Sequence, residues 1–267
     1  MSRLMIRKVA DVLSLFSPER PEWGVSEVAR VLELPKSTAS ELMASMADER
    51  LLSSAGRGRY RLGWRLFELG QTLLDSTEFR SEARRVMQEL VQRWGETAHL
   101  AVLEGVEAVY LDKIQPSPAV KILLSRVGVR LPAYCSGVGK VLLAYKPWDE
   151  VAALLQGRGM SALTPNTLSD LEKLADELRL VRERGYAYDL EEATIGLCCV
   201  AAPIRDYSGK VVAAMSLSVP AYRFHPRREE LTAAIVEAAG RVSDASGRNS
   251  YEIEGFSIYG RKELQGA

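Results

Sequence analysis

The sequence predicts an α+β protein built from two domains. Residues 1–62 read as three helices followed by a glycine-containing hairpin, whereas strands joined by short turns dominate from residue 97 onward. Amphipathic helices lie between those strands, which favours an antiparallel sheet covered by helices. For 267 residues of ordinary globular composition we expect one domain at 1–63, a linker helix at 64–78, a second domain at 79–250 and a polar tail at 251–267.

The N-terminal domain is predicted to be a winged helix-turn-helix. Apolar residues recur at helical spacing between Ile6 and Phe16, and Ser26 is expected to cap a short second helix over 26–33. A turn at 34–35 leads into a third helix that starts at Lys36, and a polar turn at 53–58 joins two short strands. Two helices joined by a short turn and followed by a hairpin form a compact DNA-reading unit.

The distribution of charge indicates where this domain would contact DNA. The chain carries 35 basic and 35 acidic residues, so a DNA-binding surface has to be local. No acid occurs between Ser53 and Arg65. The predicted DNA-contacting residues lie at the start of the third helix and on the hairpin: Lys36, Ser37, Thr38, Ser40, Arg57, Arg59 and Arg61. An interaction module that does not touch DNA is the alternative, because such patterns also arise in helical bundles and basic turns are often only solvated.

The second domain is expected to alternate between helices and strands. An amphipathic helix over 79–94 follows the linker helix, and Gly105 joins two strands in a hairpin. A helix over 169–185 is expected to begin with a serine cap and to end at Gly185. The predicted strands are 97–104, 107–114, 119–125, 186–190, 197–204 and 211–219, and the remaining helices are 137–145, 149–155 and 227–242. The sequence GRNS at 247–250 is interpreted as the end of the domain.

Few features of the sequence point to catalysis or metal binding. The two histidines, His99 and His225, have no second ligand at metal spacing, and neither an HExxH nor a GxSxG motif is present. We therefore expect no metal site and no other cofactor. The enzyme alternative is a nucleophilic Cys135 or Cys199 paired with His99, but buried structural cysteines are favoured.

Cysteine usage and apolar runs indicate the compartment. The three cysteines form no CxxC pair, which is typical of a protein in a reducing cytosol. The N-terminal residues lack the apolar core and cleavage site of a signal peptide. The longest uncharged runs, such as 193–204, are far shorter than the ~20 residues of a membrane-spanning helix. We expect a cytoplasmic protein that does not contact a membrane.

Three short stretches could line a ligand pocket. The run SGVGK at 136–140 would place small residues at a helix N-terminus, where backbone amides can meet a ligand or where the helix packs closely on the sheet. Asp189, Glu191 and Glu192 follow a strand and form either a pocket rim or a solvated face. On the later strands, Cys198 and Cys199 must point to opposite sides, and Ser216 and Ser218 to the same side.

Many collinear motifs together resemble the IclR family of bacterial regulators. They include PKSTASELMASM, GRYRLGWRLFELG, GETAHLAVLEG, SRVGVRLPAYCSGVGKVLLA, ERGYAYDLEE and VVAAMSLSVPA, and the resemblance covers roughly residues 5–245. It implies a winged helix-turn-helix, a linker helix and a GAF-like effector-binding domain. It further implies dimers or tetramers that bind a palindromic operator in double-stranded DNA and control a nearby catabolic operon in response to a small-molecule effector.

The resemblance also implies the position of the effector. The ligand of relatives lies against the sheet under the segment that here reads LPAYCSGVGK, so the pocket candidates are Leu123, Gly137, Val138, Asp189, Leu197, Cys199 and Ser216. Because helix-end amides favour anions and Asp189 disfavours a purely anionic ligand, a small hydroxylated carboxylate fits best. The sequence departs from the family pattern at Ser40-Glu41 in the third helix, at Leu190 and Cys198 near the pocket, and after Asn249.

Overall fold

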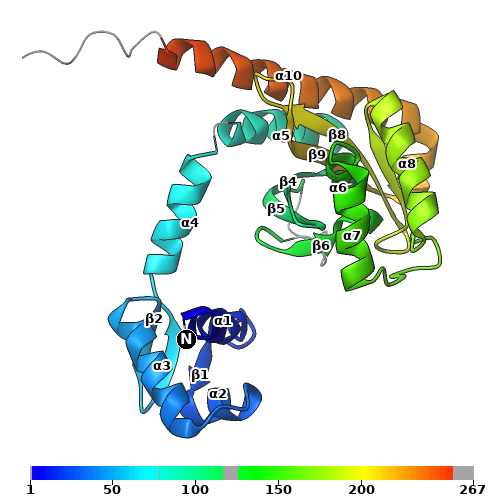
Figure 1. Ribbon diagram of the computed structural model, residues 1–267. Coiled ribbons are helices and arrows are strands. Elements are labelled where there is room, and N and C mark those ends of the chain that lie inside the picture. The colour runs from blue at the N-terminus through cyan, green and yellow to red at the C-terminus, as the bar shows by residue number, and fades with distance from the viewer. Residues whose placement is uncertain (1, 78, 117–125, 255–267) are drawn as a thin grey trace, which may run out of the picture. The chain divides into compact units, whose positions relative to one another are not determined.

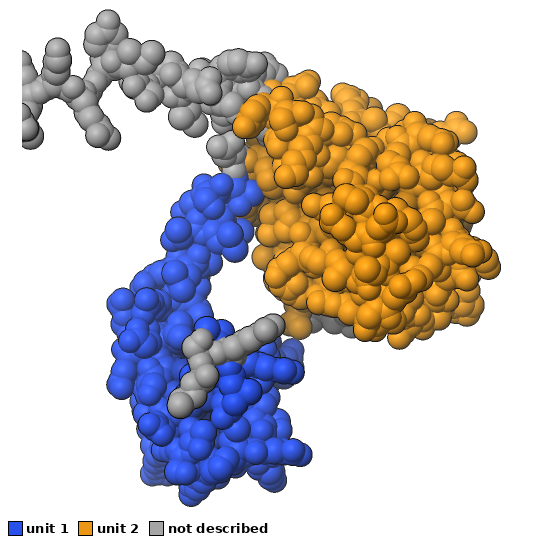
Figure 2. All heavy atoms as spheres, in the orientation of Figure 1, with its two compact units in different colours: residues 1–77 blue, residues 78–267 orange. Residues whose placement is uncertain are grey.

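The computed structural model describes residues 2–77, 79–116 and 126–254, and within these ranges it describes side chains from residue 4 to residue 245. The predicted strand at 119–125, including Leu123, therefore lies outside the described residues. The chain forms two compact units, Met1–Thr77 and Glu78–Ala267 (Figure 2). Each unit has its own apolar core.

The first unit is a small helical domain with a three-stranded sheet. Its elements are α1 (Ser2–Ser14), β1 (Glu22–Gly24), α2 (Val25–Val31), α3 (Lys36–Asp48), β2 (Leu52–Gly56), β3 (Arg59–Leu62) and α4 (Arg65–Asp75). The antiparallel strands lie in the order β1-β3-β2. Val12, Val28, Met43 and Leu52 are buried between the helices and the sheet. This is the predicted winged helix-turn-helix, with β3 and β2 as the wing (Figure 1).

The start of α2 differs from the prediction. Gly24, not Ser26, is the N-cap residue, and the Glu27 carboxylate accepts a hydrogen bond from the Gly24 amide at 2.8 Å. The Glu27 side chain, at the third position of the helix, forms one half of a capping box in place of the serine cap that the sequence predicted. The helix starts earlier because Glu22–Gly24 pairs with β3 as a short strand, which the sequence did not indicate.

The second unit contains a six-stranded antiparallel sheet. Its strands are β4 (Thr97–Glu104), β5 (Glu107–Ile114), β6 (Arg130–Pro132), β7 (Ala187–Leu190), β8 (Leu197–Arg205) and β9 (Val211–Pro220), in the order β6-β5-β4-β9-β8-β7. The predicted α+β class with an antiparallel sheet is therefore confirmed. β6 falls in a segment predicted as loop, because its three residues become a strand only by pairing with β5.

Helices cover both faces of this sheet (Figure 1). They are α5 (Arg80–Trp94), the 3₁₀ turn η1 (Ala133–Cys135), α6 (Gly137–Ala144), α7 (Trp148–Arg158), α8 (Leu171–Arg184), α9 (Ala221–Phe224), the 3₁₀ turn η2 (His225–Arg227) and α10 (Arg228–Glu254). α5 and α10 pack on one face, and α6, α7 and α8 on the other. Within the described residues, no helix is both long and apolar enough to cross a membrane.

Two helix ends in this unit differ from the predictions. Asp170, rather than Ser169, caps α8 through a 2.9 Å hydrogen bond from the Lys173 amide. α10 continues to Glu254, so the stretch 247–250 that was interpreted as a domain end lies inside a helix. A single Gly247 costs a helix only about 1 kcal/mol and does not have to end it.

The pleat of the central strands divides their side chains between the two faces. Met215 and Leu217 join the core under α5 and α10, whereas Ser216 and Ser218 point to the α6 side. Cys198 likewise joins the α5 and α10 core, and Cys199 points to the α6 side. The predicted alternation is confirmed at both pairs, and it puts polar side chains under the N-terminus of α6.

Candidate functional site

The N-terminal end of α3 presents a polar surface. Lys36, Ser37 and Ser40 are exposed and Thr38 is half-buried, whereas the opposite face of the helix is buried in the domain core. Pro35 precedes the helix and has no side-chain cap to offer, so the first amides of α3 have no side-chain acceptor at the cap. This end of the helix is therefore available to an external acceptor such as a phosphate.

The three wing arginines have different surroundings. Arg59 donates to the Glu27 carboxylate and to the Glu22 carbonyl oxygen, each at 3.2 Å. A nitrogen of Arg61 lies 3.6 Å from the Glu22 carboxylate. Arg57 is exposed at the turn between β2 and β3 and forms no ion pair with any described residue. Of the three, Arg57 has the charge that is least neutralised inside the domain.

A cavity lies on the α6 side of the six-stranded sheet. The space open to water-sized groups is about 30 Å³, enough for a water molecule and far below the roughly 300–1,000 Å³ of small-molecule sites, so a larger ligand would have to displace lining side chains. Six of the seven predicted pocket residues line it, and the seventh, Leu123, lies outside the described residues. The lining residues are His99, Tyr110, Leu131, Ser136, Gly137, Val138, Asp189, Ala193, Thr194, Leu197, Cys199, Ser216 and Ser218.

The N-terminus of α6 forms one wall of this cavity. The Ser136 hydroxyl caps the helix by accepting the Gly139 amide at 3.2 Å. The amides of Gly137 and Val138 donate to no acceptor among the described residues. A Cβ on Gly139 would lie 2.2 Å from the Ala133 carbonyl oxygen, whereas a Cβ on Gly137 would meet only ordinary contacts. Gly139 therefore serves close packing, and the two preceding residues offer amides to the cavity.

A chain of hydrogen bonds crosses the floor of the cavity. The Ser218 hydroxyl lies 3.2 Å from Nδ1 of His99 and 3.0 Å from Sγ of Cys199. The His99 and Tyr110 rings meet edge to face at 5.3 Å. Burial, together with the nearby Lys113 charge, lowers the pKa of His99 to about 3, and burial raises the pKa of Tyr110 far above its usual range. The floor is therefore polar and uncharged at neutral pH.

Among the described residues, Asp189 is the only acid that lines the cavity. It accepts the Glu192 amide at 2.7 Å, and burial, followed by the Glu192 charge, raises its pKa to about 7. Glu192 itself forms a buried ion pair with Lys140 of α6. Burial raises the pKa of Glu192, and the Lys140 charge opposes this rise. No described arginine or lysine lines the cavity, so backbone amides are its positive groups.

The arrangement does not support a nucleophilic cysteine. Burial, followed by the Asp189 charge, raises the pKa of Cys199 well above its usual value. Burial also raises the pKa of Cys135 to about 12. Ser218 joins Cys199 to His99, but a neutral thiol and an imidazole with a lowered pKa oppose formation of a thiolate–imidazolium pair.

Several residues that line the cavity were not predicted from the sequence. His99 was considered as the partner of a nucleophilic cysteine rather than as a pocket residue, and the structure places its buried ring on the cavity floor. Four further lining residues could not be predicted, because neither their type nor their spacing in the sequence indicates a ligand site: Tyr110, Leu131, Ala193 and Thr194. Ser218 could have been selected, because it shares a strand face with Ser216.

Comparison with known proteins identifies the family. The IclR helix-turn-helix domain family matches residues 6–56, and the bacterial transcriptional regulator IclR C-terminal family matches residues 71–244. The Escherichia coli regulator XynR is 36% identical over 214 residues, which cover 80% of this chain and 84% of XynR. The E. coli regulator KdgR is 35% identical over 248 residues, which cover 92% of this chain and 94% of KdgR.

Solved structures have the same fold along nearly the whole chain. IclR of Thermotoga maritima is 31% identical, with a TM-score of 0.72 over 92% of this chain and 99% of that one. An IclR homologue from Microbacterium hydrocarbonoxydans in complex with 4-hydroxybenzoate is 31% identical, with a TM-score of 0.78 over 91% of this chain and 98% of that one. Both family domains are present in order, and the chain is a member of the IclR family of bacterial transcriptional regulators.

Proposed function

We propose that the cavity under α6 binds a small hydroxylated carboxylate and that this effector controls binding of the winged helix-turn-helix to operator DNA. The observation that carries the proposal is the pair of amides at Gly137 and Val138, which have no acceptor among the described residues and belong to residues that line a cavity with neutral polar groups. The family consists of ligand-responsive DNA-binding regulators rather than enzymes, so the domain that bears the cavity is the sensing domain.

A carboxylate suits the α6 end of the cavity. Two amides at a helix N-terminus that no described residue accepts from, together with the partial positive charge of the helix, favour an anion. Leu131 and Val138 add apolar surface on the same side. An effector carboxylate would be held there without an arginine.

The opposite end of the cavity is suited to binding a hydroxyl group of the ligand. Ser216, Ser218 and neutral His99 can each donate or accept a hydrogen bond, and Asp189 accepts from a ligand hydroxyl when it is ionised. The relative from Microbacterium hydrocarbonoxydans was crystallised with 4-hydroxybenzoate, which has a carboxylate and a hydroxyl at its two ends. A ligand of that chemical class matches the polarity of this cavity.

The proposed DNA contacts come from α3 and the wing. Lys36, Ser37, Thr38 and Ser40 would lie at the major groove, and Arg57 would contact a phosphate next to it. Arg59 and Arg61 were predicted as contacts as well, but their acidic partners within the domain reduce their charge. We assign them a weaker contribution.

A homodimer or tetramer would bind a palindromic operator. α4 buries none of its residues and exposes Phe67, Leu69 and Leu73, and its N-cap residue Trp64 is exposed as well. Exposed apolar side chains in such number on one helix are typical of an interface with another protein chain. A dimer presents two α3 helices to two half-sites. Because the operator is chromosomal DNA, the protein would act in the cytoplasm.

A paired ligand screen tests the effector proposal. Thermal unfolding of the full chain is measured with hydroxylated aromatic and aliphatic carboxylates and with the primary amide of each. We expect carboxylates, but not their amides, to raise Tm, and we expect Gly137→Val to abolish the rise by filling the cavity. The matched control is Gly157→Val, where a Cβ would meet nothing within 4 Å. Stabilisation by the amides alone, or an unchanged rise in Gly137→Val, would refute the proposal.

A further inference from the structure

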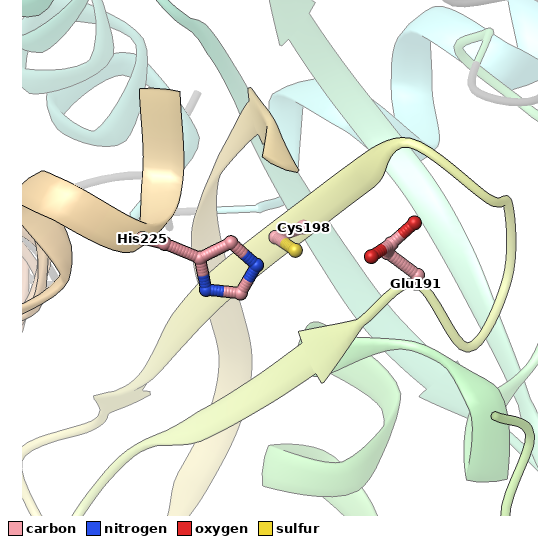
Figure 3. A group of neighbouring side chains, drawn as sticks. All are labelled: Glu191, Cys198 and His225. Carbon is pink, nitrogen blue, oxygen red and sulfur yellow. The ribbon is translucent and has the colours of Figure 1, made fainter. Parts of the chain in front are cut away.

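Three possible metal ligands from three different segments of the chain lie together on the side of β8 opposite the cavity. Glu191 follows β7, Cys198 lies on β8, and His225 begins the turn after α9 (Figure 3). One ligand atom of each residue, a carboxylate oxygen, Sγ and a ring nitrogen, lies within 4.8 Å of the other two. Figure 3 shows the three side chains directed toward one another.

This cluster is separate from the effector cavity. Cys198 belongs to the core under α5 and α10, and the adjacent Cys199 lines the cavity on the opposite face of the strand. Cys198 is buried, Glu191 is half-buried and His225 is exposed, so the cluster opens to solvent on the histidine side. A metal ion could enter from that side without disturbing the core.

The backbone around the cluster holds two of the ligands in place. The Gly196 amide donates to the Glu191 carboxylate at 2.6 Å, and the Gly196 carbonyl oxygen accepts the Ala221 amide at 2.8 Å. Gly196 therefore links the loop that bears Glu191 to the start of α9, the helix that precedes His225. Thr164 adds a hydrogen bond from its hydroxyl to the Glu191 carbonyl oxygen at 2.7 Å. Such outer contacts orient ligands in metal sites.

We propose that Glu191, Cys198 and His225 form a site for a zinc-like divalent transition metal. Sulfur, imidazole nitrogen and carboxylate oxygen are the three ligand types that Zn²⁺ uses, whereas Mg²⁺ and Ca²⁺ require oxygen ligands. Two of the three ligands are anionic when bound, because the thiol releases its proton to solvent on coordination. Three protein ligands leave a fourth tetrahedral position for water.

The metal would also act on the effector cavity. The loop between β7 and β8 carries Glu191 on the metal side, and its residues Ala193 and Thr194 line the cavity. A metal that joins Glu191 to β8 and α9 would restrain this wall of the cavity. This second part rests on the proposed function, whereas the metal site itself does not.

Cobalt titration tests the site directly. The reduced, metal-free full chain is titrated with Co²⁺, whose thiolate complexes have a characteristic charge-transfer absorption, and then with Zn²⁺ as competitor. We expect one Co²⁺ per chain, displaced by Zn²⁺. Because loss of even an outer contact weakens metal binding by about 10–100-fold, His225→Ala and Glu191→Gln should weaken it at least about tenfold. Cys198→Ser should remove the charge-transfer band.

Control substitutions test whether the charge-transfer band comes from Cys198 or from another cysteine. Cys199→Ser changes the next residue on the same strand, and Cys135→Ser the remaining thiol, and both should keep the band. His225 is exposed, so His225→Ala tests the site without perturbing the core. Absence of the band in the unmodified chain, its survival at full strength in His225→Ala, or its loss in Cys199→Ser would overturn the proposal.

Hydrogen exchange tests the link to the cavity. Zn²⁺ should slow exchange of the backbone amides of 192–196 at least about tenfold in the unmodified chain and leave them unchanged in His225→Ala. Stoichiometric metal binding with unchanged exchange would overturn the link to the cavity and leave the site standing. Neither readout requires DNA or an effector, so a failure of the proposed function would be seen separately.

Discussion

Gly139 lies so close to Ala133 that a side chain at position 139 has no room: its Cβ would approach the Ala133 carbonyl oxygen to 2.2 Å. The contact joins α6 to the turn η1 that precedes it. Two glycines two residues apart in α6 therefore have different roles, because the Cβ of Gly137 would reach only 3.4 Å from Cβ of Ala201.

Gly139→Ala should destabilise the protein, because the backbone of η1 or α6 has to move to accept the methyl group. Overpacking should cost up to about 3 kcal/mol and the better helix propensity of alanine should offset up to about 1 kcal/mol, so we expect a net loss of about 2 kcal/mol in the free energy of unfolding, measured by urea denaturation. Gly137→Ala is the matched control and should stay within about 1 kcal/mol of the unmodified protein. Equal effects of the two substitutions would contradict this assignment.

Arg57→Ala should weaken binding to all DNA sequences. If Arg57 contacts one phosphate, its removal should reduce the slope of log K against log salt by about 0.9, measured by fluorescence anisotropy on DNA from the protein's own promoter region. Arg130→Ala, which removes an exposed arginine from the sensing domain, serves as control and should leave the slope unchanged. An unchanged slope in Arg57→Ala would show that the wing tip does not touch DNA.

Arg59→Ala should act mainly on the first domain itself. Its guanidinium joins β3 to Glu22 and Glu27, and Glu27 also caps α2. We expect a lower Tm for the first domain and a smaller change in the salt slope than with Arg57→Ala. The reverse order of salt slopes would indicate that Arg59 leaves its acidic partners to bind a phosphate.

The buried pair of Lys140 and Glu192 should be strongly coupled. Side-chain exposure is 2% for Lys140 and 7% for Glu192, and Oε2 of Glu192 has no hydrogen-bond partner among the described residues. Lys140→Met would leave a buried carboxylate without its counter-charge, at a cost of about 3–5 kcal/mol. Adding Glu192→Leu should recover much of this loss in a double-mutant cycle measured by urea denaturation. Additive losses would show that the two charges do not depend on each other.

His99 should make stability depend on pH below neutrality. Its pKa is about 3 in the folded protein and 6.5 in the unfolded chain, so below pH 6.5 the unfolded state binds the extra proton. The contribution of neutral His99 is therefore complete above pH 6.5 and is lost as the pH falls toward 3. Between pH 7 and pH 5 the loss amounts to at most about 2 kcal/mol.

The measurement for His99 is a difference between two proteins. Urea unfolding of the unmodified chain and of His99→Gln at both pH values isolates this residue from Asp189, whose raised pKa gives the opposite slope. The free-energy difference between the two proteins should shrink at pH 5. A difference that does not change with pH would mean that His99 is not buried in its neutral form.

The sequence by itself determined most of the secondary structure of the described residues and, in the later strands of the second unit, the face on which a residue lies. The bounds predicted for β4 and β5 agree with the structure, because alternating polarity and a turn glycine are local signals. The same period of two placed Ser216 opposite Met215 and Cys199 opposite Cys198. Predictions were wrong where another nearby residue could fulfil the same local role. The sequence predicted that Ser26 would cap α2, but Gly24 is the N-cap residue and the Glu27 side chain accepts its amide.

Only the tertiary structure decided which of these residues meet. It paired Arg59 with Glu22 and Glu27, Lys140 with Glu192, and His99 with Cys199 through Ser218. It also joined Glu191, Cys198 and His225, for which the sequence had predicted no metal site. The physical reason is that periodicity sets the direction of a side chain within its own element, whereas strand order and helix packing set its distance to residues elsewhere in the chain.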